Sequence, residues 1–166
     1  MATVSVAPIE IRRERAGEAN RIRALLVGSF PSAYESQIVD HLREDGDAVI
    51  SLVAVEAGDV VGYVMLSRMS APFAALGLGP LAVCPGRREL GVAGRLVRRA
   101  IAEARREGWL AIFVLGDPAY YARFGFSDEL AAGFSSDYAA PYLMALALGE
   151  AGLPTTTGRI DYADAF

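Results

Sequence analysis

Residues Leu78–Glu107, LGPLAVCPGRRELGVAGRLVRRAIAEARRE, are typical of a strand, a glycine-containing turn and a long helix. The strand segment Leu78–Val83 is apolar but contains Gly79 and Pro80. Because proline cannot donate to a sheet ladder, we expect a bulge or an exposed edge at this point. Some backbone groups of this strand should therefore remain free.

The second half of the stretch predicts a helix that begins close to Gly91. Apolar residues recur at helical spacing, with arginines mostly between them: Val92, Leu96, Val97, Ala100, Ile101 and Ala104. A helix start carries unpaired N–H groups and the positive end of the helix dipole, and both favour an anion. The small residues Gly91, Ala93 and Gly94 leave room for one, which predicts a phosphate site. The phosphate-loop and dinucleotide-binding glycine patterns are both absent.

Two motifs, in the right order, resemble those of a known family. The segment Arg88–Ala93, RELGVA, resembles the Arg/Gln-x-x-Gly-x-Gly/Ala signature of the GNAT superfamily of acyl-CoA N-acyltransferases, whose turn holds the coenzyme A pyrophosphate; Ala93 is an accepted variant. Gly116–Phe126, GDPAYYARFGF, is similar to the late helix in which a tyrosine lies four residues before Gly-Phe. Ile38–Ser67 is similar to the YhbS-like branch, so the resemblance covers nearly the whole chain.

The resemblance implies the fold, the cosubstrate and its site. The fold would be α+β, a GNAT αβα sandwich with a mixed, mostly antiparallel twisted sheet flanked by helices. Acetyl-coenzyme A would be the cosubstrate, with no metal. Its binding residues would be Leu81, Val83, Arg88, Leu90, Gly91, Ala93 and Gly94. Arg95 and Arg123 are looser candidates for the phosphates, and a solvated helix face explains these two equally well.

Tyr121 is the candidate general acid. A phenol with a pKa of about 10 can donate its proton to a thiolate at little cost in free energy, because the corresponding thiol has a pKa of about 8.5. The family places a tyrosine at this spacing for that purpose. An aromatic residue packed under the sheet is the competing interpretation, and Tyr120 is a lesser alternative for the acid.

No general base can be identified from the sequence. His41, the only histidine, falls in a predicted polar helix and is expected at the surface. Glu35, Asp117 or an ordered water could take the proton. Cys84 ends the strand beside the expected thioester, but we interpret it as a small strand-end residue because no histidine is predicted next to it.

Length and charge limit the number of domains and the kinds of partner that the chain can have. At 166 residues the chain fits one domain, 1–166, and no apolar run approaches the length of a membrane span. The net charge of -4 argues against nucleic acid or anionic membranes as partners. The charged early residues lack an apolar signal core, and the single cysteine cannot form an internal disulfide. We therefore expect a cytoplasmic protein.

The remaining elements follow from periodicity and turn signals. We expect helices over 16–29, 32–44 and from 118 to about 125, and strands over 9–13, 48–56, 60–68, 110–115 and 142–148. The tail 155–166 is either a final strand segment or an arm that packs on a partner. A homodimer is compatible with the apolar strand near the C-terminus.

These observations predict an N-acetyltransferase that moves an acetyl group from acetyl-coenzyme A to a primary amine by direct attack in a ternary complex. The alternative is a non-catalytic acyl-coenzyme A sensor that has kept the cofactor groove, and the missing base motivates it. A third, weaker reading is an O- or S-acyltransferase. The acceptor would be a small molecule or a peptide, and its pocket carries no motif.

Overall fold

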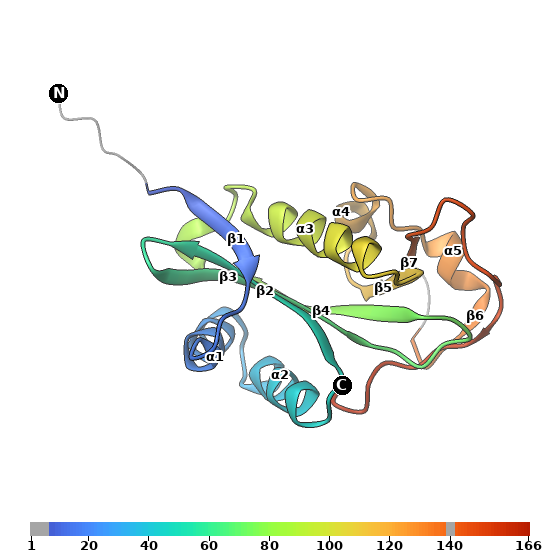
Figure 1. The fold of residues 1–166 in the computed structure, drawn as a ribbon, viewed down its shortest axis with the longest axis horizontal. Coiled ribbons are helices and arrows are strands. Elements are labelled where there is room, and N and C mark those ends of the chain that lie inside the picture. The colour runs from blue at the N-terminus through green and yellow to red at the C-terminus, as the bar shows by residue number, and fades with distance from the viewer. Residues whose placement is uncertain (1–6, 139–141) are drawn as a thin grey trace.

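The computed structural model describes residues 7–138 and 142–166, and a six-stranded sheet runs through them (Figure 1). Its order is β1-β2-β3-β4-β5-β7, and all neighbouring strands are antiparallel except the β4–β5 pair. The strands are β1 (Ile9–Arg13), β2 (Ala48–Glu56), β3 (Asp59–Arg68), β4 (Ala75–Val83), β5 (Ala111–Leu115) and β7 (Leu143–Ala147). The expected mixed, mostly antiparallel sheet is thereby confirmed.

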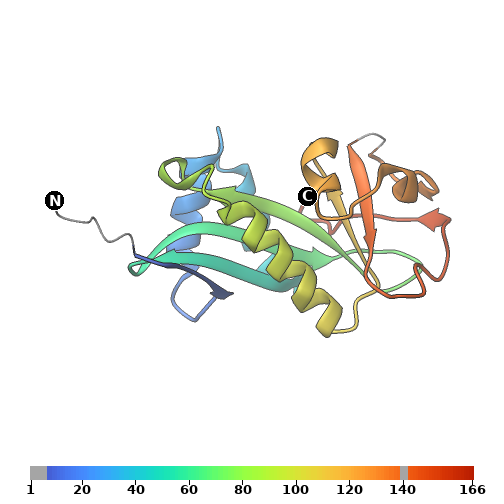
Figure 2. The same cartoon turned by 90° about the horizontal axis from the view of Figure 1, so that it is seen from above.

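Helices cover both faces of this sheet. The helix α3 (Val92–Arg106) crosses one face, and α1 (Ala19–Ser29) and α2 (Tyr34–Glu44) lie on the opposite face (Figures 1 and 2). The apolar face of α3 is fully buried at Leu96 and Val97, because its small and branched side chains fill the space above the sheet. The arrangement is the αβα sandwich that was expected. In the described part of the chain, no helix is both long and apolar enough to cross a membrane.

Two further helices and a small strand pair complete the molecule. The short helix α4 (Pro118–Ala122) follows β5, as expected, whereas α5 (Asp128–Ala132) was not foreseen. In the C-terminal tail, β8 (Gly158–Arg159) pairs with β6 (Phe134–Ser135). Of the two alternatives for the tail, the strand segment is therefore the one that the fold uses, and the tail packs on its own chain.

The expected irregularity at Gly79 and Pro80 is a bulge. Val64 pairs with Leu81 and Leu66 pairs with Leu78, so β4 carries one more residue than β3 over this interval. β4 lies between β3 and β5 in the sheet, but its pairs with β5 end at Leu78. Pro80 therefore lies at the bulge and beyond the part of β4 that pairs with β5.

Candidate active site

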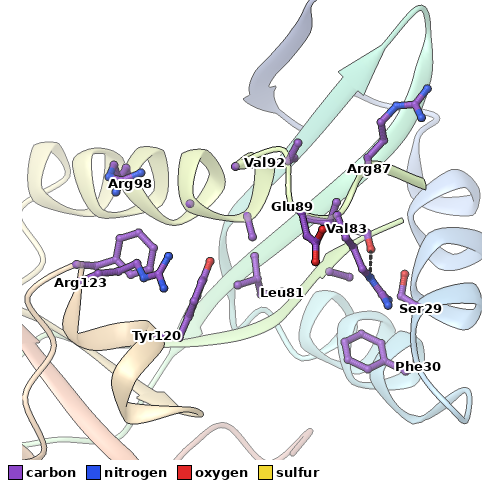
Figure 3. A pocket seen from close by; sticks show the side chains of 16 residues that line it. Ser29, Phe30, Leu81, Val83, Arg87, Glu89, Val92, Arg98, Tyr120 and Arg123 are labelled. Carbon is purple, nitrogen blue, oxygen red and sulfur yellow. Dashed lines mark hydrogen bonds between the residues drawn. The ribbon is translucent and has the colours of Figure 1, made fainter. Parts of the chain in front are cut away.

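The strands β4 and β5 separate at the level of Leu78. The last pair of their parallel ladder is Leu78 with Val114, although β4 continues to Val83 along β3. Leu81 and Val83 consequently have no ladder partner on β5 within the described residues. The side chain of Arg88 donates from Nε to the Val83 carbonyl oxygen at 3.2 Å (Figure 3). An open wedge therefore lies between the two strands, with β4 backbone along one side.

The turn after β4 leads to the start of α3, where no side chain caps the helix. The 3₁₀ turn η1 (Pro85–Arg87) leads to Gly91, which has a left-handed φ of 76° and caps α3 without a side-chain hydrogen bond. A Cβ added at Gly91 would meet no atom within 4 Å. The start of α3 therefore has open space beside it, and its first residues line a cavity in which an anion could reach their N–H groups.

A cavity of about 580 Å³ joins the wedge to the helix start (Figure 3). Six of the seven residues predicted to bind the cosubstrate line this cavity: Leu81, Val83, Arg88, Gly91, Ala93 and Gly94. The seventh, Leu90, does not line it, and its side chain is 62% exposed. Ser29 and Phe30, at the end of α1, form the far wall, and no sequence signal pointed to them.

Arginines dominate the charge of the cavity. Arg87 pairs with Glu56, whereas Arg88, Arg98 and Arg123 make no ion pair among the described residues. Arg98 lies over the Phe124 ring at 5.1 Å and Arg123 over the Tyr120 ring at 4.6 Å, both to the ring centroid. Since Glu89 is the one carboxylate in this lining, the cavity is an electropositive, anion-accepting site.

Arg98 lines the cavity but was not among the candidates from the sequence, whereas Arg95, a looser candidate, does not line it. Arg95 reaches away to the Ile9 carbonyl oxygen at 2.8 Å. Arg98 follows Gly94 by one helical turn, and a Cβ at Gly94 would lie 3.1 Å from its guanidinium nitrogen. The i, i+4 relation to the small residues was the signal that could have identified it.

The two adjacent tyrosines of α4 occupy different places. Tyr120 is half-buried and lines the cavity, and burial raises the pKa of its phenol, an effect that Arg123 and Arg98 partly offset. Tyr121 does not line the cavity and is only 9% exposed. Its ring lies against Gly116, two residues past Val114, the last β5 residue that pairs with β4. Burial raises the pKa of Tyr121 to about 12, and the neighbouring Tyr120 adds to the shift.

None of the candidate base side chains lines this cavity. His41 is exposed on α2, as expected, and Asp117 accepts a hydrogen bond from the Ala119 N–H at 3.0 Å as the cap of α4. Glu35 has a buried carboxylate oxygen without a hydrogen-bond partner in the described part of the chain, but it does not line the cavity. Cys84 packs partly buried between two core clusters. Residues 7–138 and 142–166 contain no cluster of His, Cys, Asp and Glu that could hold a metal ion.

Comparison with known proteins places this geometry in one family. The model of the acetyltransferase (GNAT) family matches residues 19–126. The uncharacterized N-acetyltransferase YhbS of Escherichia coli K12 is 43% identical over 126 residues, which are 74% of this chain and 74% of that protein.

Two solved structures match over nearly the full length of the chain. The crystal structure of E. coli YhbS in complex with CoA has a TM-score of 0.90 and 32% identity, covering 99% of this chain and 95% of that one. A GNAT family acetyltransferase from Brucella melitensis, in complex with acetyl-CoA, has a TM-score of 0.81 and 32% identity, covering 96% and 98%. The fold is therefore that of known GNAT acetyltransferases.

Proposed function

Because the chain belongs to the acetyltransferase (GNAT) family, we propose that it binds acetyl-coenzyme A in the arginine-lined cavity and transfers the acetyl group to a primary amine. Residues 1–166 act in this proposal as one N-acetyltransferase domain. The observation that carries it is the alignment of the open β4–β5 wedge with the uncapped start of α3, which offers one continuous site to an elongated anionic thioester.

The proposed binding uses backbone groups and arginines. Leu81 and Val83 present the free edge of β4 to the pantetheine arm, whose amides need hydrogen-bond partners. The N–H groups of Gly91, Ala93 and Gly94 at the start of α3 receive the pyrophosphate, together with Arg88. Leu90 takes part through its backbone only, since its side chain points to solvent. Arg98 and Arg123 lie further along the cavity and add positive charge.

The proposed chemistry is direct transfer within a ternary complex. The amine nitrogen attacks the thioester carbonyl carbon, so a C–N bond forms while the C–S bond breaks. The nitrogen loses one proton to water or a base, and the departing thiolate takes one proton. The products are the amide and free coenzyme A, and no oxidant or metal is required for the balance.

We assign the proton donor to Tyr121. Its ring lies against Gly116, two residues past Val114, the last β5 residue that pairs with β4, and Tyr120 lies beside Arg123 in the cavity lining. With a pKa raised to about 12, the Tyr121 phenol stays protonated at neutral pH, although it is a weaker acid toward the thiolate than an unburied phenol would be. The fixed position of its ring at Gly116 supports Tyr121 in this proposal, and Tyr120, which lines the cavity, stays the alternative.

Calorimetric titration with acetyl-coenzyme A and coenzyme A tests the binding, and thiol release with a panel of amines tests the transfer. We expect about micromolar binding and amine-dependent release above the hydrolytic background. Absence of binding would overturn the proposal. Binding without transfer to any amine would leave the alternative, a non-catalytic acyl-coenzyme A sensor.

A further inference from the structure

The strand β1 is an edge strand of the sheet, and its outer side carries backbone groups that do not pair with β2. Glu14 donates its N–H to the Ser51 carbonyl oxygen at 2.9 Å, which fixes the hydrogen-bonded pairs between the two strands. Because hydrogen-bonded and non-hydrogen-bonded pairs alternate in an antiparallel ladder, Ile9, Ile11 and Arg13 belong to the second kind. Their N–H and C=O groups therefore point away from β2, toward the free edge.

Two arginines of α3 donate to the first two of these outward carbonyl groups. Arg95 donates from Nη2 to the Ile9 oxygen at 2.8 Å, and Arg99 donates from Nη1 to the Ile11 oxygen at 3.4 Å. The spacings match, because four residues of a helix rise about 6 Å and two residues of a strand rise about 7 Å. The helix therefore runs along the edge of β1 in register with it.

The same side of α3 continues to the end of β1. Glu103 and Glu107 follow Arg99 at the same four-residue spacing, and both bind the Arg13 guanidinium at 3.1 Å. The third outward carbonyl group, that of Arg13, accepts a hydrogen bond from Nη1 of Arg12 at 3.0 Å. Every outward carbonyl group of β1 thus has an arginine donor.

This arrangement bears on how the protein can associate. An edge strand with free backbone groups is a template for pairing with another chain. A second copy of this chain would need the outward carbonyl groups of β1 as acceptors for its own N–H groups. The guanidinium groups occupy these acceptors, and their charge and volume lie where the added strand would lie. Pairing at this edge would first have to break the three arginine hydrogen bonds.

We propose that Arg95 and Arg99 close the β1 edge against pairing with a second copy of this chain. Their partners are backbone groups, so the closure depends on the position of α3 and not on the side chains of β1. The inference is independent of the proposed function, since neither arginine lines the arginine-lined cavity.

Removal of both donors should open the edge. The double variant Arg95→Ala, Arg99→Ala should self-associate at least about tenfold more tightly than the wild type, measured by sedimentation velocity over a range of protein concentrations. Charge cannot account for this result, because the loss of two arginines takes the formal net charge from -4 to -6 and increases the repulsion between copies. Equal association of the double variant and the wild type would overturn the proposal.

The matched control removes two arginines that donate to carbonyl groups away from β1. Arg21 donates to the Gly58 oxygen at 3.2 Å, and Arg105 donates to the Leu148 oxygen at 3.1 Å. The double variant Arg21→Ala, Arg105→Ala has the same net charge as the first double variant and should associate as the wild type does. Association of both double variants to the same extent would contradict the proposal, because the effect would not be specific to β1.

Two reversals connect the association to the β1 edge. The N–H of Ile11 points outward, so Ile11→Pro removes a donor of the free edge and no hydrogen bond to β2. Added to the variant Arg95→Ala, Arg99→Ala, it should return the association constant to within about threefold of the wild-type value. Arg95→Lys, Arg99→Lys leaves β1 unchanged and should also associate as the wild type does, because an ammonium group can donate to the same carbonyl groups. Association that persists in both reversals would mean that the copies do not meet at β1.

Discussion

The ring of Tyr121 lies directly on the α-carbon of Gly116, where a Cβ would be 2.4 Å from a ring carbon. Any side chain at this position would displace the ring, so the glycine after β5 determines where the phenol sits. The ring is also held edge-on by Phe126, with centroids 5.8 Å apart. Gly116 and Phe126 therefore fix the position of the Tyr121 ring.

Removal of the Tyr121 hydroxyl should impair turnover more than binding. We expect Tyr121→Phe to lower kcat by about a hundredfold or more, the usual contribution of a general acid, with the coenzyme A affinity unchanged. In the wild type, the pKa of about 12 should keep the acid protonated, so this group should cause no loss of rate between pH 7 and about pH 10. Steady-state kinetics with calorimetric titration check both points.

Tyr120→Phe is the matched control, since it removes the neighbouring hydroxyl. It should leave kcat within about threefold of the wild type. The reverse pattern, a large loss in Tyr120→Phe and none in Tyr121→Phe, would move the acid to Tyr120, which lines the arginine-lined cavity.

A bulky residue at Gly91 should block the anion site. Gly91→Val places a branched side chain in the open space before α3 and strains a left-handed backbone, so coenzyme A should bind at least about tenfold more weakly. Gly86→Val is the control, because Gly86 also has open space around its Cβ position but lies outside the cavity. Titration of both variants with coenzyme A gives the comparison. Equal affinity in Gly91→Val and the wild type would contradict the phosphate site.

Local signals predicted the centre of this fold well. The bulge in β4 follows from Pro80, whose missing N–H acts on its immediate neighbours, and the start of α3 at Gly91 follows from the glycine and the apolar spacing after it. The wedge between β4 and β5 was not predicted, because no local pattern states where a ladder ends.

Contacts between distant segments escaped prediction. The contact between Tyr162 and Gly77 joins the C-terminal tail to β4, and no sequence pattern near either residue predicts it. Similarly, Ser29 and Phe30 reach the arginine-lined cavity only because α1 packs across the sheet. Periodicity shows which residues are buried and leaves open what they touch.

The contact between Gly77 and Tyr162 should appear as energetic coupling. Gly77→Ala forces a methyl group into the Tyr162 ring and should cost about 1–3 kcal/mol of unfolding free energy. In a Tyr162→Ala background the same change should cost at least about 1 kcal/mol less, because the ring is gone. Denaturant unfolding of the four proteins completes the cycle. Additive effects would mean that Tyr162 does not rest on Gly77.

Gly28→Ala is the control for Gly77→Ala, because the added methyl group contacts no other residue. Gly28 is exposed in α1, and a Cβ there meets nothing within 4 Å. Alanine should therefore stabilise the protein by about 0.5–1 kcal/mol through helix propensity. A loss of stability from this change would show that α1 does not tolerate alanine on its exposed face.

The ion pair between Glu18, at the start of α1, and Arg12 of β1 should make the free energy of unfolding depend on pH in the acid range. Glu18 accepts two hydrogen bonds from the Arg12 guanidinium, each 2.8 Å, and one from the Arg15 N–H at 2.6 Å. The Arg12 hydrogen bonds lower the pKa of this carboxyl to about 2, against burial that acts in the opposite direction. A lowered pKa stabilises the fold fully above the unfolded value of 4.5, and this contribution is lost as the pH falls toward 2.

Glu18→Gln should therefore be less stable than the wild type by about 2 kcal/mol at pH 7, allowing for solvent screening of a pair near the surface. The difference should shrink as the pH falls below 4.5 and should nearly vanish by pH 2, because the protonated carboxyl resembles the amide. Glu10→Gln, on the exposed side of β1, should show no such dependence. Urea unfolding of the three proteins across this pH range measures it. A Glu18→Gln deficit that persists unchanged at pH 2 would mean that shape, and not charge, joins Glu18 to Arg12.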